Sequence, residues 1–92
     1  MTIIDDVSFL GGSLNSYRSG LYIPPTPEQI KHVMKTYNLD VKTIAFIVGS
    51  VYNEEKYDCS TVRGWLKGNR PIPYPSWRLI LLKAEIISIK DL

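Results

Sequence analysis

The chain has 92 residues, of which 45% are hydrophobic and 22% charged, with a formal net charge of +2. This length suits one small core and leaves no room for a second folded domain, and the composition is too apolar for wholesale disorder. The lone Cys59 excludes an internal disulfide framework, and no run of about 18 apolar residues suggests a membrane-spanning helix. We therefore expect a cytoplasmic protein that needs no metal or other cofactor.

Residues 1–25 differ in composition from the rest of the chain. They contain the breakers Gly11-Gly12-Ser13 and Ser19-Gly20 and end at Pro24-Pro25. Their short apolar stretches, residues 7–10 and 21–23, suit either brief strands or hydrophobic anchors. We expect an N-terminal arm, partly extended and ordered by packing on the domain or on a partner.

The remaining residues, 26–92, are expected to form one helical domain. Thr26, Pro27 and Gln29 have the pattern of an N-cap, a first-turn proline and a capping box, which predicts a helix that ends at Asn38. Asp40 is a suitable N-cap for a second helix, which Gly49 would end.

Two more helices follow a polar stretch without a clear period. The third is expected from about Ser60 to Leu66, and the fourth from about Pro75 to Ile87. The fourth is apolar nearly all round, and a monomer this small should not easily hide every face of it. We therefore expect a homodimer that forms through Trp77, Ile80, Leu81, Ala84 and Ile87. The predicted fold is an all-α bundle of four to five helices.

Charge is concentrated in one segment. Residues 60–83 contain five basic side chains and no acidic one, which leaves the rest of the chain at −3. Such a one-signed segment is expected where phosphates bind, but a solvated basic face explains it equally well.

The second and third helices match the helix-turn-helix pattern. Val62 and Trp65, three residues apart, can anchor the third helix to the core and leave its other side chains for the major groove. Arg63 is the side chain best suited to bidentate contact with guanine. The expected DNA-binding residues are Lys42, Thr43, Ser60, Thr61, Arg63, Gly64, Lys67, Asn69 and Arg70. Arg18 of the arm is a candidate for the minor groove, unless the arm adds to the dimer contact instead.

The segments LDVKTIAFIVG (39–49) and STVRGWLKGNRPIP (60–73) resemble lambda-repressor-like, or XRE-family, helix-turn-helix regulators. The tail 72–83 and the start at 25–30 are similar to short regulators of phages and other mobile elements. The resemblance covers about residues 25 to 84. It implies a DNA-binding transcriptional regulator, most simply a repressor, in the bacterial cytoplasm or nucleoid. It also implies a dimer on an operator in double-stranded DNA, which we expect to be an inverted repeat.

Two features depart from that family. About nine residues separate Gly49 from Cys59, where the family has a turn of only a few. This insertion either contacts DNA or merely bulges from the turn, and its acidic residues would be repelled by phosphates. Gly64 replaces a longer side chain that reads bases in many relatives, and a close approach of the backbone to DNA is one possible reason.

The alternative to a DNA reader is an adaptor or antitoxin-like module on the same fold, which binds another protein through the fourth helix and the arm. An enzyme is not expected, because the sequence has no glycine-rich phosphate loop, no nucleophile motif and a single histidine.

Overall fold

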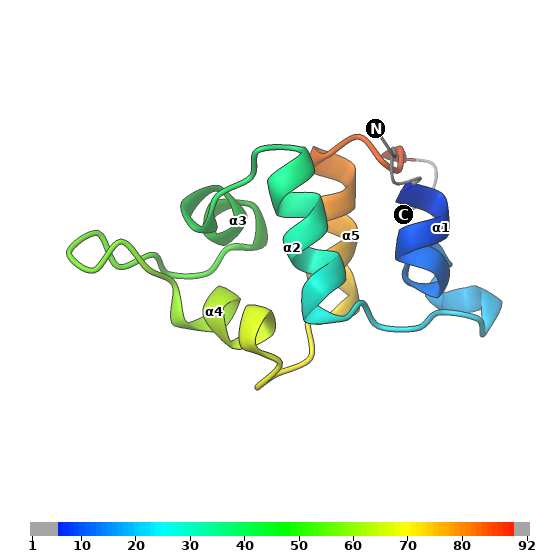
Figure 1. The fold of residues 1–92 in the computed structure, drawn as a ribbon, viewed down its shortest axis with the longest axis horizontal. Coiled ribbons are helices and arrows are strands. Elements are labelled where there is room, and N and C mark those ends of the chain that lie inside the picture. The colour runs from blue at the N-terminus through cyan, green and yellow to red at the C-terminus, as the bar shows by residue number, and fades with distance from the viewer. Residues whose placement is uncertain (1–5, 90–92) are drawn as a thin grey trace.

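The computed structural model describes residues 6–89, and within that range the chain is all-helical with no strand. The ends of the expected arm and domain, residues 1–5 and 90–92, lie outside it. The α-helices are α1 (Asp6–Leu10), α2 (Pro27–Thr36), α3 (Val41–Val48), α4 (Ser60–Lys67) and α5 (Tyr74–Lys83), and two short 3-10 helices, η1 (Gly11–Leu14) and η2 (Tyr17–Ser19), follow α1 (Figure 1). The expected all-α bundle of four to five helices is confirmed.

The helix starts agree with the sequence signals. In the capping box of α2, the amide of Gln29 donates to Oγ1 of Thr26 over 3.2 Å, and the amide of Thr26 donates to Oε1 of Gln29 over 2.8 Å. At α3, Oδ1 of Asp40 accepts a hydrogen bond from the amide of Thr43 over 2.8 Å. Each cap pairs an amide that the helix itself leaves without a partner.

The end of α5 differs from the expectation. This helix stops at Lys83 rather than near Ile87, because Glu85 adopts a left-handed conformation with a φ of 62°. The amide of Glu85 then donates to Leu82 O, and the amide of Ile86 donates to Leu81 O, both over 3.0 Å. This is the hydrogen-bond pattern of a Schellman motif. It was missed in the sequence because glycine usually occupies that position.

The core lies where the helices meet. Helix α3 packs on α5 and on α4, and α2 packs on α4. Every one of these helices contributes fully or almost fully buried apolar side chains, namely Ile30, Val33, Ile44, Ala45, Val62, Trp65, Trp77, Ile80 and Leu81. The packing of α2 and α3 on α4 fixes which side of α4 remains outside.

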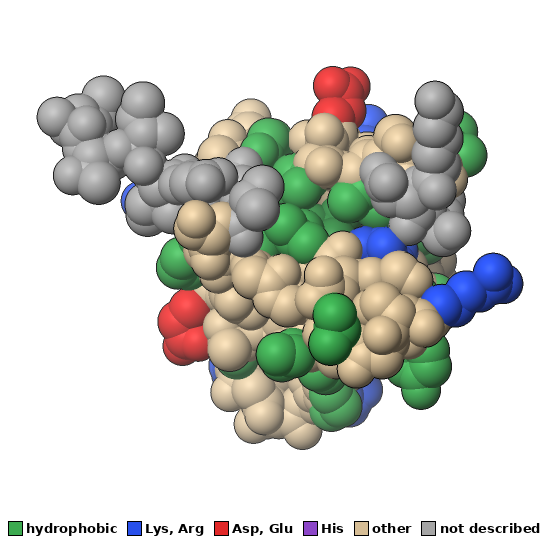
Figure 2. Space-filling view, turned by 90° about the vertical axis from the view of Figure 1, so that its right-hand side faces the viewer, with side chains coloured by type: hydrophobic (Ala, Val, Ile, Leu, Met, Phe, Trp, Pro, Cys, Tyr) green, Lys and Arg blue, Asp and Glu red, His purple; other side chains and the backbone are tan. Residues whose placement is uncertain are grey.

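The N-terminal segment is part of the same packed body. Leu10 has no exposed surface, and the buried Ser13 lies beside it in η1. Ser13 O accepts a hydrogen bond from the indole Nε1 of Trp77 over 3.0 Å, and Leu14 O accepts one from Nη1 of Arg78 over 3.0 Å. Figure 2 views the face that carries this segment, where hydrophobic side chains lie in separate groups among polar groups and backbone. The described part of the arm therefore packs on α5 within a single chain.

This covering corrects the expected dimer interface. Trp77, Ile80 and Leu81 have no exposed surface, and Ala84 is 7% exposed, so these four side chains are not available to a second copy. Ile87 is half-buried. The expectation treated α5 as too apolar for a monomer to hide, and it did not assign the packing of the arm to this helix. Ser13 and Leu14 of the arm contact α5, and Leu10 belongs to the same core cluster.

Candidate nucleic-acid interface

Helix α4 has a clear inner and outer side. Val62 is fully buried and Trp65 is 4% exposed, so these two side chains anchor the helix to the core as expected. Ser60, Arg63 and Lys67 are exposed on the outer side. The spacing of three to four residues between members of each set places them on opposite faces of the helix.

The outer side of α4 and the loop after it form one polar depression of about 400 Å³. Six of the nine sequence-predicted residues line it: Ser60, Arg63, Gly64, Lys67, Asn69 and Arg70. Three of these carry a positive charge, and the depression has no carboxylate among its lining residues in the described part of the chain. A concave surface with cations and amide groups suits the phosphate oxygens of a nucleic-acid backbone.

Gly64 has an explanation within the protein. It is buried, and a Cβ added there would lie 3.2 Å from Cδ and 3.3 Å from Cγ of Arg70. The amides of Asn69 and Arg70 also donate to Gly64 O, over 2.9 and 3.3 Å. The glycine therefore lets the aliphatic stem of Arg70 fold back over α4. A close approach of DNA to this backbone is not needed to explain it.

The N-termini of α3 and α4 differ. Asp40 caps α3, and the hydrogen bond from the amide of Thr43 holds the pKa of this carboxyl below its usual value, so the α3 end already carries an anion. Cys59, the N-cap of α4, makes no side-chain cap hydrogen bond within the described residues. The N-terminal amides of α4 are thus better suited to bind a phosphate than those of α3.

The insertion folds into a small hairpin, which we call the 50–58 hairpin. Asn53 and Asp58 form an isolated antiparallel bridge, with amide-to-carbonyl hydrogen bonds of 2.7 and 3.2 Å. Oδ1 of Asn53 also accepts hydrogen bonds from the amides of Glu55 and Lys56, both over 3.0 Å, which orders the turn. The hairpin projects beyond α3 and α4 (Figure 1).

Acidic side chains of the 50–58 hairpin contact cations of both neighbouring helices. Oδ2 of Asp58 lies 2.8 Å from Nη1 of Arg63 on α4. Oε1 of Glu54 lies 3.3 Å from Nζ of Lys42 on α3. The hairpin thus does more than bulge, since it pairs with two of the predicted DNA-binding residues. From the sequence, Asp58 was expected only to be repelled by the phosphates of DNA. No local sequence pattern predicts its pairing with Arg63.

Lys42 and Thr43 do not line the depression on α4. They line a second, mainly apolar depression of about 380 Å³ together with Phe46, Ser50, Tyr52 and Glu54. The ammonium of Lys42 lies 5.6 Å from the ring centre of Tyr52, and desolvation of this phenol raises its pKa. Thr61, the ninth predicted residue, is half-buried and lines neither depression.

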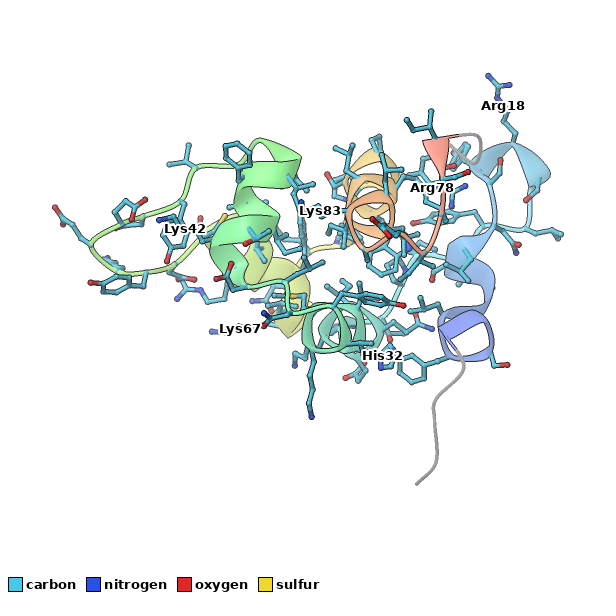
Figure 3. The ribbon with its side chains drawn as sticks, turned by 90° about the horizontal axis from the view of Figure 1, so that it is seen from above. Arg18, His32, Lys42, Lys67, Arg78 and Lys83 are labelled. Carbon is cyan, nitrogen blue, oxygen red and sulfur yellow. The ribbon has the colours of Figure 1, made fainter. Side chains whose placement is uncertain are left out.

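Arg78 and Arg18 do not extend the α4 surface. Arg78 is 3% exposed, and its guanidinium lies 5.3 Å from the ring centre of Tyr74, so it belongs to the fold rather than to a basic face. Arg18 lies at the upper right edge of the molecule in Figure 3, whereas Lys67 lies left of its centre. This position gives no support to a minor-groove contact next to α4.

Comparisons with protein-family models, with curated proteins and with solved structures find no match for this chain. Among the described residues, no helix is long and apolar enough to cross a membrane. No cluster of three or more potential metal ligands occurs in the same range. The geometry of the α4 surface is therefore the main guide to function.

Proposed function

We propose that this chain is a sequence-specific double-stranded DNA-binding protein that regulates transcription, most simply as a repressor, with α4 as its recognition helix. The observation that carries the proposal is the basic depression on the outer side of α4. Arg63, Lys67 and Arg70 line it together, while Val62 and Trp65 hold the opposite side of the helix in the core. A recognition helix needs this division between anchored and free side chains.

Helix α3 supports the proposal by its place in the chain and in the fold. It precedes α4, packs against it, and ends at Gly49, which adopts a left-handed φ of 74°. In a helix-turn-helix unit the first helix crosses the backbone while the second enters the major groove. Lys42, on the exposed side of α3, is suited to such a backbone contact once it exchanges Glu54 for a phosphate.

The test is a gel-shift experiment on duplex DNA selected from a random pool by the wild-type protein. Arg63→Ala should abolish or strongly reduce the shift, because a bidentate contact between arginine and guanine contributes about 1–3 kcal/mol. Arg18→Ala is the matched control, since it removes an exposed arginine that lies away from Lys67 of α4 (Figure 3). Equal retardation by wild type and Arg63→Ala would contradict a role for α4 in reading DNA.

The competing function is an adaptor that binds another protein. The observation in its favour is the apolar surface around α3, where Phe46 is 87% exposed and Val51 is 88% exposed. Large exposed apolar side chains beside a depression suit a protein partner. For an adaptor, Phe46→Ser should abolish partner capture, and Arg63→Ala should have little effect.

We also propose that two copies bind one inverted repeat, which would place two α4 helices in successive major grooves about 34 Å apart. The buried side chains of α5 do not supply the contact between copies, so it must use surface outside them. Light scattering at micromolar concentration, alone and with the selected duplex, should give a mass of two chains. One chain per duplex would contradict the dimer and leave DNA binding itself in place.

A further inference from the structure

The ion pair between Asp58 and Arg63 engages only part of the guanidinium. Asp58 Oδ2 contacts Nη1 over 2.8 Å, whereas the edge formed by Nε and Nη2 has no partner among the described residues. The Arg63 side chain remains 53% exposed. A guanidinium has five N–H donors, so the free edge still has two that can point the same way. Two parallel donors match O6 and N7 of guanine in the major groove.

Asp58 is held more firmly than an ordinary surface acid. Its side chain is 24% exposed, and its backbone forms both hydrogen bonds of the bridge to Asn53 at the base of the 50–58 hairpin. Glu54, the other paired acid, is 69% exposed and lies in the turn. An ordered carboxylate can fix the rotamer of a long side chain before DNA arrives, which removes an entropy cost from binding.

We infer that Asp58 is a positioning residue, which orients Arg63 so that its free edge reads guanine in the major groove. This inference rests on the proposed function. It adds which base is read, guanine, and which residue orients Arg63 for that contact. The inserted hairpin then has a role in specificity, because it delivers a fixed carboxylate to the recognition helix. Its negative charge also disfavours nearby phosphates, so Asp58 supports base reading at the expense of non-specific backbone binding.

The test measures binding to two duplexes that differ only at the guanine that the selected sequence places opposite Arg63, and to an unselected duplex. Asp58→Asn should reduce the preference for guanine by about tenfold while affinity for the unselected duplex stays equal or rises. Glu54→Gln is the matched control, since it neutralises the other paired acid of the hairpin. It should leave the base preference unchanged. Thermal unfolding followed by circular dichroism confirms that each variant is folded.

A second experiment, in the Arg63→Lys variant, distinguishes the orientation of the Arg63 side chain from its positive charge. Arg63→Lys keeps the positive charge but has no planar fork to orient, so it should lose the guanine preference and retain affinity for unselected DNA. In that background Asp58→Asn should have no further effect on base preference. If Asp58→Asn alone does not fold, Arg63→Lys still tests whether the guanidinium of Arg63 reads guanine, as the inference requires.

The possible outcomes are distinct. Tighter binding of Asp58→Asn to every duplex, with an unchanged preference for guanine, would overturn the inference and make Asp58 a simple electrostatic shield. An unchanged preference in Arg63→Lys would also overturn it. Failure of the wild type to select any duplex would instead overturn the proposed function, and the inference with it.

Discussion

Replacing Leu10 by alanine should destabilise the whole domain, although this residue lies far from α4 in the chain. Leu10 has no exposed surface and belongs to the same core cluster as Trp77 and Ile80. A Leu-to-Ala change at a fully buried site costs about 2–5 kcal/mol, because it loses both transfer free energy and packing. A domain of 92 residues has a total stability of about 5–14 kcal/mol, so the loss is a large fraction of it. The corresponding fall in Tm is on the order of 10–30 °C.

The assay is urea unfolding followed by circular dichroism and by tryptophan fluorescence. The midpoint should fall with little change in m, and both probes should report the same transition. Leu21→Ala is the control within the same segment, because Leu21 is 66% exposed and its truncation should change stability by less than about 0.5 kcal/mol. If Leu10→Ala is as mild as Leu21→Ala, the segment does not cover α5 in solution, and the correction to the dimer interface fails with it.

Three further predictions concern charge and packing in α3 and α4. The pKa of the Asp40 carboxyl lies below its ordinary value of 3.8, so this carboxylate stabilises the fold above that pH and the stabilisation is lost as the pH falls below it. Asp40→Asn keeps an acceptor oxygen without the titration. It should therefore lose less stability than the wild type between neutral and acid pH in acid unfolding curves. Gly64→Ala should change the free energy of unfolding by less than about 1 kcal/mol, because improved helix propensity offsets the contact with Arg70, yet it should weaken DNA binding in fluorescence anisotropy toward the level of Arg70→Ala. Lys67→Ala should reduce the slope of log affinity against log salt by about 0.9, and an unchanged slope would mean that Lys67 contacts no phosphate.

Local signals in the sequence predicted the helices well, because each is encoded within a few residues. The capping box at Thr26 and Gln29 and the C-terminal glycine at position 49 are found where they were expected. The Glu85 conformation was not predictable, since a non-glycine residue at a φ of 62° depends on the tertiary packing around it. The sequence left open whether the N-terminal segment packs on the domain or on a partner, and it did not predict the helical turns α1, η1 and η2. The contacts of this segment, such as Ser13 with Trp77, join residues 64 positions apart.

The candidate site was predicted in part. The residues of α4 and its exit share one surface because helical spacing alone brings Ser60, Arg63 and Lys67 together. The pairing of Lys42 with Glu54 was not predictable, since it depends on where the fold places the 50–58 hairpin relative to α3. The pairing of Asp58 with Arg63 depends on the same fold.

Selection of bound sequences from a random pool of duplex DNA tests the central claim most directly. The wild-type protein should enrich one recurring sequence that contains guanine, arranged as an inverted repeat, and Arg63→Ala should enrich none. A pool that stays random after repeated rounds with the folded wild-type protein would contradict sequence-specific DNA binding by α4.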